Sequence, residues 1–444
     1  MRMGIGLGVG ISRSNYAQGI FSAYQSRVIA DGGVTEAGAC VDAVSGLLQS
    51  ASLLLIPSGY KSGKAYAEIP TNGNGDLTWT RASTALRTNS SGLLESMGSG
   101  VPRLSYMYGS CPALLLEPQR TNLITQSQNF ADVSWAKLGL GAGSAPVVTA
   151  NAGISPEGIN NATRVQFNCG GTTSSDRSIL QKASVSITNT TNYAATIYVK
   201  AYSSGEVGKQ LRFISESAVN QITITLTDSW QRVSTTGVSN AILSNYLIET
   251  RGTFTTNTTA DVLIYGAQLE AGAYPTTYIP TTSATATRIA DSFSRNNIYT
   301  NGLITSSGGT WFVELRGNVS YTRDGFGALY LGTQSLTTST TGDGLYIRRN
   351  DLSSNRLSIQ SYISGVATAL YTTTTDTVKI ALKWNGTSVD VFVNGTKQVS
   401  ASAFTPTAME FLGHSTIVDV PKFIQQMALF PSALTDTQCQ TLTT

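Results

Sequence analysis

The chain of 444 residues has few of the side chains from which catalytic and metal sites are built. It contains a single histidine, which excludes a zinc or iron site with several histidine ligands. Its four cysteines are far apart and form no CxxC pair, so we expect isolated thiols and not a disulfide framework; they are Cys40, Cys111, Cys169 and Cys439. We therefore expect neither a metal nor another cofactor.

Charge is also scarce, at 12% of residues, with 29 Lys and Arg against 26 Asp and Glu. So small an excess of positive charge does not create an electrostatic potential that would attract a phosphate backbone. We therefore expect no nucleic-acid and no membrane-surface partner. No apolar run approaches the ~18 residues of a membrane span. The start "MRMGIGLGVGIS" has an apolar run that is short and rich in glycine, without a convincing cleavage pattern, so we do not expect secretion.

Threonine, serine, asparagine and glycine are abundant instead, and long Thr-rich stretches favour pleated strands over helices. Between residues 111 and 285 candidate strands recur at intervals of about 8 to 15 residues, the spacing of an antiparallel sandwich or jelly roll. These strands are "TRVQFN", "NYAATIYVKAYS", "KQLRFIS", "NQITITLT", "WQRVSTT", "YLIETRGTF" and "ADVLIYGAQLE".

A second series of strands follows residue 286, with "TWFVELRG", "FGALYLG", "DGLYIRR", "RLSIQSYI" and "ATALYTTT". The stretch "TVKIALKWNGTSVDVFVNGTKQVS" alternates apolar residues on one face and has Asn-Gly turns at 385–386 and 394–395, which predicts a three-stranded meander. Thr435 and Gln438 have the spacing of a capping box, so a short terminal helix is expected. The fold class predicted is all-β, with two antiparallel sandwiches.

Residues 1–30 contain aromatic side chains but no helical or strand period. We expect such a segment to become ordered only by docking onto another protein. The docking residues would be Tyr16, Phe21 and Tyr24.

Apolar residues from Val34 to Leu48 recur at three- and four-residue spacing behind Thr35, which predicts one short amphipathic helix. Turn-rich small strands follow up to about residue 110. Because no large domain covers the apolar stripe and the following "SASLLLIP", we expect a homotrimer, or else a dimer, joined through residues 31–110.

The stretch "YGAQLEAGAYPTTYIPTT" leads from a strand into a segment with Pro275 and Pro280. Neither proline donates to a ladder, and each favours an extended residue before it. We expect residues 274–282, called the strap below, to lie on the surface as a semi-rigid connector between two independent sandwiches. Tyr274 and Tyr278 should pack on the sandwich that precedes the strap in the sequence.

No arrangement of side chains indicates catalysis. A glycosidase would need two carboxylates about 5 to 10 Å apart in one cleft. Glu314 and Asp390 lie on predicted strands and are the candidates, but carboxylates on strands are also ordinary surface residues. His414, with Ser415 beside it and Asp419 nearby, lacks a G-x-S-x-G elbow, and an edge loop explains this run more simply.

Sugar binding would use exposed aromatic rings, and the second series of strands offers five tyrosines: Tyr321, Tyr330, Tyr346, Tyr362 and Tyr371. Strand alternation turns most of them toward the core or a neighbouring chain, so no ligand-binding residue is assigned. Calcium could bind the loops "YTRDGFG" and "NDLSSN", which carry Asp and Asn side chains, but no metal site is assigned either.

The run from "TWTRASTALRTNSSGLLESMGSGVPRLSYMYGSCPALLLEPQRTNLI" through "SWQRVS" to "YGAQLEAGAYPTTYIPT" resembles fibre and appendage proteins of tailed phages, especially those of gut Bacteroides-like hosts. The resemblance implies a jelly roll similar to carbohydrate-binding modules and a concanavalin A-like or laminin G-like sandwich at the end. Four segments follow: docking 1–30, oligomerisation 31–110, jelly roll 111–285 and sandwich 286–444.

The resemblance also implies a structural protein on the surface of a phage particle, made in the host cytoplasm and attached to other virion proteins through its N-terminus. Host surface polysaccharide is the candidate ligand, and no enzymatic activity is expected. Head and tail locations both stay open. The alternatives are a secreted bacterial carbohydrate-binding protein or adhesin, and a glycan depolymerase.

Overall fold

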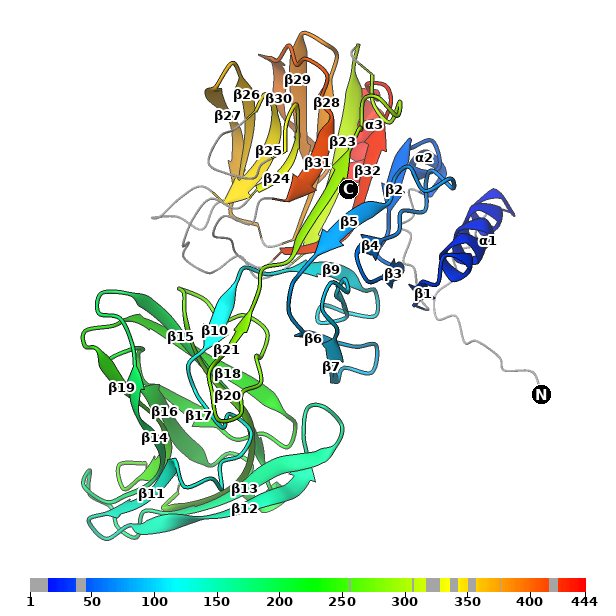
Figure 1. Ribbon diagram of the computed structural model, residues 1–444. Coiled ribbons are helices and arrows are strands. Elements are labelled where there is room, and N and C mark those ends of the chain that lie inside the picture. Colours follow the sequence, from blue (N-terminus) through cyan, green and yellow to red (C-terminus); the bar gives the residue numbers. More distant parts are fainter. Residues whose placement is uncertain are drawn as a thin grey trace, which may run out of the picture.

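The computed structural model describes residues 15–36, 45–254, 257–305, 307–316, 328–335, 342–349, 357–375, 377–414 and 422–444, of which residues 15–21, 45, 328, 349 and 422 are described by their backbone alone. The protein is all-β, as predicted, and consists of two antiparallel sandwiches joined by a short ladder (Figure 1). Helices are few and short, and none in the described part combines the length and apolarity that a membrane span needs.

The first sandwich, called the split sandwich, consists of two sheets. Sheet A has the strand order β1 (Val34–Thr35), β3 (Gly59–Lys61), β4 (Lys64–Ala65), β5 (Leu77–Thr80), β22 (Ser292–Asn296), β31 (Phe411–His414), β24 (Ala328–Gly332), β25 (Gly344–Arg349), β26 (Leu357–Ile363) and β27 (Val366–Thr373). Sheet B has the order β30 (Thr396–Ala403), β29 (Ser388–Val393), β28 (Val378–Trp384), β23 (Gly309–Arg316), β32 (Lys422–Phe430), β9 (Ala113–Leu116) and β8 (Leu104–Ser105), and β2 (Leu53–Leu55) pairs with β32.

Alternating side chains of the two sheets form one buried core, which includes Trp79, Trp311 and Trp384. The predicted meander is confirmed as β28, β29 and β30, with Asn385-Gly386 and Asn394-Gly395 at its turns. The terminal helix α3 (Asp436–Thr443) is confirmed together with both hydrogen bonds of its capping box.

The predicted boundary at residue 110 is wrong, because residues 34–116 supply strands to both sheets of the split sandwich. Strand β5 pairs with β22, and β9 pairs with β32, so each pair joins segments on either side of the second sandwich. Most of the described strands between residues 31 and 110 are therefore part of the sandwich and not of a separate unit. The small hairpin of β6 (Ala85–Thr88) and β7 (Leu94–Met97) is attached to it.

The second sandwich is inserted into the first and lies below it in Figure 1. Its sheets are β11 (Trp135–Leu140), β14 (Arg177–Ser186), β19 (Leu243–Arg251), β16 (Gln210–Ser215) and β17 (Ile222–Thr225), and β12 (Ser144–Ile154), β13 (Asn160–Asn168), β20 (Thr259–Ala271), β15 (Asn192–Ala201) and β18 (Gln231–Val238). The chain enters through β10 (Arg120–Asn122) and leaves through β21 (Ala286–Arg288), which pair with each other. We call residues 123–285 the inserted sandwich.

Most of the strap is buried between the sandwiches, and only Pro280 and Thr282 are exposed, so the predicted surface connector is wrong. Tyr278 packs on Tyr265 of the inserted sandwich and on Leu86 of the β6–β7 hairpin. Its hydroxyl group lies 2.6 Å from that of Ser127. The prediction that Tyr278 packs on the sandwich of residues 111–285 is confirmed by its contact with Tyr265, whereas Tyr274 is buried with Ala273 and contacts the Arg120 guanidinium.

Helix α1 (Asn15–Ala30) contradicts the prediction that residues up to 30 become ordered only on another protein. Tyr24 and Val28, one turn apart, pack on Tyr66 of the split sandwich. Arg27 adds hydrogen bonds of 2.7 Å to Asp76 and 2.6 Å to the carbonyl of Ala67. The i,i+4 spacing of Tyr24 and Val28 was the pattern that the sequence interpretation missed.

The helix predicted behind Thr35 is wrong at its start, where Val34 and Thr35 form strand β1. Its last residues are helical, as α2 (Ser45–Leu48), and residues 37–44 lie outside the described residues. Leu48 and the following Leu54 are buried beneath α3 on the outer face of sheet B. Since the chain covers these residues itself, the apolar surface that motivated a homotrimer is absent there.

Cys111 is disulfide-bonded, so the expectation of four isolated thiols is wrong. Cys169 and Cys439 are free and buried, and Cys40 lies outside the described residues. Sequence spacing cannot show which cysteines the fold brings together, and this pairing was therefore missed.

We expect a fragment of residues 286–444 to show no cooperative unfolding in calorimetry. It lacks β2, β8 and β9 of sheet B and four strands of sheet A, so much of the core would be open. A fragment of residues 119–288 retains both sheets and the ladder of the inserted sandwich and should unfold cooperatively. Cooperative unfolding of residues 286–444 alone would contradict the split arrangement.

A second prediction concerns Glu68, which accepts hydrogen bonds from Ser58 and from the backbone of Ile56. Burial raises the pKa of Glu68 from 4.5 to about 8. Between these values the folded protein retains a proton that the unfolded chain has lost, so the free energy of unfolding should fall as pH rises. Urea unfolding from pH 5 to 8 should show this slope in the natural chain and a flatter one in Glu68→Gln; an unchanged slope would refute the assignment.

Candidate functional site

A cavity of about 520 Å³ opens beside the ladder that joins the two sandwiches. This volume falls in the range of small-molecule sites, about 300 to 1,000 Å³. Four separate parts of the chain line it: Gln119, Arg120, Thr121, Leu123, Ser186, Ile187, Thr188, Tyr193 and Ala271. Strands β10, β14, β15 and β20 thus bring their ends together at one place.

The lining combines an apolar part with several polar groups. Leu123, Ile187 and Tyr193 supply the apolar part, and Ile187 and Tyr193 are buried. The backbone N–H of Thr188 donates to the Tyr193 hydroxyl at 2.8 Å, which fixes the ring. Hydroxyl groups from threonine and serine and the amide of Gln119 supply donors and acceptors around it.

Arg120 is the one charged residue in this lining. Its Nη2 donates to the Tyr274 hydroxyl at 2.9 Å, and its guanidinium carbon lies 5.0 Å from the centre of that ring. Its Nη1 donates to the carbonyl of Gln119 at 3.1 Å. A Cβ atom at Gly272 would lie 2.7 Å from Nε, so a glycine is needed there for the arginine to fit. The strap tyrosine therefore holds the guanidinium in place.

The sequence interpretation singled out none of the cavity residues. They are ordinary strand-end residues, and only the pairing of β10 with β21 and of β15 with β20 brings them together. Arg120 lies within the quoted phage-like run, but nothing local to it indicates a site.

Three of the five tyrosines considered for sugar binding lie together on the outer face of sheet A. The ring centres of Tyr330 and Tyr346 are 6.2 Å apart, and those of Tyr346 and Tyr362 are 4.8 Å apart. Arg348 lies 4.8 Å from the last two rings. The three side chains are at most 9% exposed, so these rings pack against protein and offer no face to a sugar.

The other two tyrosines are also not placed as an exposed platform. Tyr371 is half-buried on β27 against the core, and Tyr321 lies outside the described residues. The two loops considered for calcium, residues 321–327 and 350–355, lie outside as well. No group of three or more potential metal ligands occurs in the described ranges.

The two candidate carboxylates do not face each other. Glu314 is buried and accepts from Gln426 at 2.7 Å, opposite Lys379 in the ladder of β23 and β28. Asp390 is on β29, opposite Lys383, with which it forms an ion pair of 2.8 Å. Strand β28 separates them, and each is engaged by its own partners.

His414 is buried on β31 and stacks on Phe293 with ring centres 6.3 Å apart. Ser415 and Asp419, its proposed neighbours, lie outside the described residues. Among the docking residues, Tyr24 is buried against its own chain, whereas the side chains of Tyr16 and Phe21 are not described. Tyr24 is therefore not an exposed docking residue in this arrangement.

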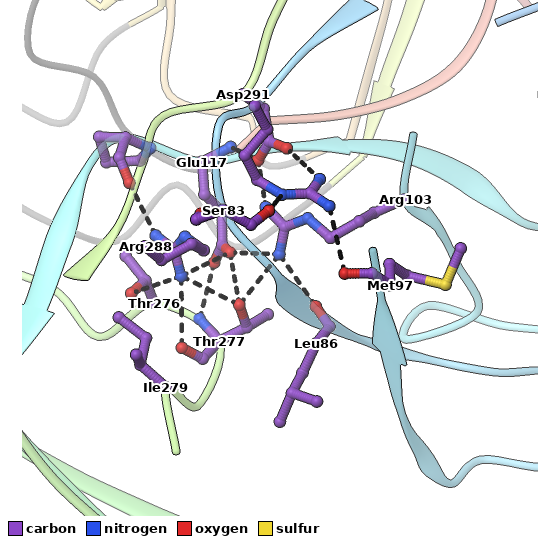
Figure 2. Close-up of polar contacts among 12 residues, drawn as sticks. Ser83, Leu86, Met97, Arg103, Glu117, Thr276, Thr277, Ile279, Arg288 and Asp291 are labelled. Atoms are coloured by element: carbon purple, nitrogen blue, oxygen red, sulfur yellow. Dashed lines mark hydrogen bonds and ion pairs between the residues drawn. The ribbon is translucent and has the colours of Figure 1, made fainter. Parts of the chain in front are cut away.

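Next to the cavity, a buried network of charges joins the strap to the split sandwich (Figure 2). Arg103 pairs with Glu117 at 2.8 Å and with Asp291, and Arg288 pairs with Glu117 at 3.0 Å. Arg81 pairs with Asp291 at 2.9 Å. All five side chains are almost completely excluded from solvent.

Thr276 and Thr277, in the middle of the strap, complete this network, and each donates two hydrogen bonds to one carboxylate. Thr277 donates from its backbone N–H and its hydroxyl to the two oxygens of Glu117, at 2.7 and 2.6 Å. Thr276 does the same to Glu270, at 2.6 Å each. With Glu270, three carboxylates balance the three arginines, so no buried charge is left without a counterpart.

These arginines determine how Glu117 titrates. Burial by itself raises the pKa of Glu117, but Arg288 and Arg103 outweigh it and lower that pKa to about 2. The carboxylate therefore stays ionised in the folded protein until strongly acidic pH.

A further charge group lies on the outer face of the sheet that contains β14. Glu249, fully buried, is paired with Arg177 at 2.6 Å, with Arg212 at 2.9 Å and with Arg251 at 3.5 Å. The Arg212 contact lacks the alignment of a hydrogen bond. These three arginines share a carboxylate of the chain, unlike Arg120.

No family model matches the chain, and no curated protein matches it significantly. Several solved structures match parts of the chain. The conserved carbohydrate esterase of the Shiga toxin-encoding bacteriophage phi24B is 15% identical over 32% of this chain and 76% of that chain, with a TM-score of 0.24. Domain 4 of the arabinanase AbnA from Geobacillus stearothermophilus, in complex with arabinotriose, is 14% identical over 38% of this chain and 82% of that chain, with a TM-score of 0.27.

The tandem CBM22 domains of Xyn10C from Paenibacillus barcinonensis are 11% identical over 70% of this chain and 98% of that chain, with a TM-score of 0.24. At such TM-scores these likenesses carry no argument about the site.

Replacing Arg103 with methionine should lower the free energy of unfolding by about 3–5 kcal/mol, because Glu117 and Asp291 would each lose a buried partner. Denaturant unfolding at pH 7 measures the loss. Arg164→Met is the control, since Arg164 forms a partly exposed pair with Asp261 and should cost much less. Equal losses in the two variants would show that the buried network contributes no more than a surface pair.

Proposed function

We propose that the chain is a glycan-binding structural protein of a phage particle, a head or tail fibre or a related appendage. In this proposal the saccharide binds in the cavity beside the connecting ladder. The observation that carries it is the composition of the lining, which places hydroxyl, amide and guanidinium groups around an apolar part formed by Leu123, Ile187 and Tyr193.

This combination suits a sugar ring. One face of a pyranose presents C–H groups that pack on apolar side chains, while its rim carries hydroxyls that both donate and accept. Thr121, Ser186 and Thr188 are hydroxyl residues with the same dual capacity. A few placed polar groups in a mainly apolar pocket are the usual features of small-ligand sites.

The phage setting is supported by the sequence resemblance alone. We propose that the protein binds its glycan without cleaving it, and that it attaches to other virion proteins through its N-terminal region. Support for binding without cleavage comes from Glu314 and Asp390, which are each occupied by partners in sheet B and not paired across a cleft.

A secreted bacterial glycan-binding protein is the second candidate. The disulfide at Cys111 favours it, because structural disulfides persist mainly in oxidising surroundings. Both candidates require the same binding chemistry at the cavity.

Filling the cavity should abolish glycan binding. Ala271 is exposed at its rim, so Ala271→Trp should block the cavity while leaving the sandwich folded. An array of bacterial surface polysaccharides, probed with the full-length chain, should show a ligand for the natural protein and at least a tenfold weaker signal for this variant.

Ala183→Trp is the matched control, since Ala183 is exposed on β14 outside the cavity. It should bind like the natural chain. The proposal fails if no polysaccharide binds, or if both tryptophan variants bind as strongly as the natural chain.

A further inference from the structure

Arg120 differs from the buried arginines of the network and from those around Glu249 in the partners that it has. It forms no ion pair with any residue of the described ranges, and its bonded partners are a carbonyl oxygen and a tyrosine hydroxyl. None of the other residues that line the cavity is acidic. The cavity therefore carries one positive charge that has no counterion among the described residues of the chain.

The guanidinium also has donors left over. Each η nitrogen carries two N–H groups, and one hydrogen bond is made by each. Nε is buried against Gly272, so the donors left for a ligand are the second N–H groups of the two η nitrogens. Because Tyr274 fixes the plane of the group, little side-chain freedom would be lost when an anion binds.

Building on the proposed function, we propose that the cavity selects a sugar acid, so that the glycan is acidic and the carboxylate of a uronic acid or a similar residue pairs with Arg120. A planar fork of N–H groups matches the geometry of a carboxylate. The ring of the same sugar would lie against Leu123, the partly exposed apolar residue of the lining, and its hydroxyls would reach the serine and threonine side chains of the rim.

The experiment varies the charge of the sugar. Oligosaccharides of glucuronic, galacturonic, mannuronic and guluronic acid, and of sialic acid, would be compared with their methyl esters, which keep the ring and lose the charge. Saturation-transfer NMR on the full-length protein detects the bound ligand and, by titration, its affinity. We expect at least one acid to bind, and its ester to bind about 10- to 100-fold more weakly.

Arg120→Gln should reduce the affinity for the acid to that of the ester. Its thermal midpoint should stay close to that of the natural chain, since no carboxylate of the described chain loses a partner. Arg120→Lys keeps the charge but not the fork, and should bind with intermediate affinity. Arg164→Gln, on the surface of the inserted sandwich, is the control and should bind normally.

The possible outcomes distinguish the glycan-binding function from the selection for sugar acids. If acids and esters bind equally, or only neutral glycans bind, the glycan-binding function stands and the selection for sugar acids is wrong. If neither acids, esters nor neutral polysaccharides bind, both are wrong. Binding of the acid that Arg120→Gln leaves unchanged would place the carboxylate elsewhere and overturn the inference.

Discussion

The arrangement of the two sandwiches depends on a buried group of three arginines and three carboxylates at their junction. Such a group is stable only when each member keeps its partners, because an isolated buried charge is very costly. Its members come from both halves of the split sandwich, from the ladder and from the inserted sandwich. The strap passes through the middle, and its two threonines donate to Glu117 and Glu270. The sandwiches are thus joined through specific polar contacts, not by a passive linker.

The same junction explains where the cavity lies and why its arginine is fixed. Arg120 follows Glu117 by three residues, and Tyr274, which holds it, precedes Thr276 by two. The segments that form the network thus continue into the cavity wall. Support of a binding residue by rigid neighbours limits the freedom that a ligand must remove on binding. A site at the border of two domains is also a common position for ligand cavities.

Much of the fold could be predicted from local patterns. Alternation and Asn-Gly turns identified β28 to β30, and the spacing of Thr435 and Gln438 identified α3 with its cap. The long-range strand pairing could not be predicted. Strands β5 and β9 pair with strands that follow more than 160 residues later, after the inserted sandwich. No local pattern contains such a pairing, and the cavity, built from four strand ends, could not be predicted for the same reason. Strand alternation indicated that most of the five tyrosines would not face solvent, and Tyr330, Tyr346 and Tyr362 are indeed buried.

The central claim is that the protein binds a saccharide in the cavity beside the ladder. A crystal structure of the full-length chain with a bound oligosaccharide tests it most directly. The account predicts a sugar ring against Leu123 with a polar group within hydrogen-bond distance of Arg120. A saccharide bound only at another surface, with this cavity filled by solvent, would contradict it.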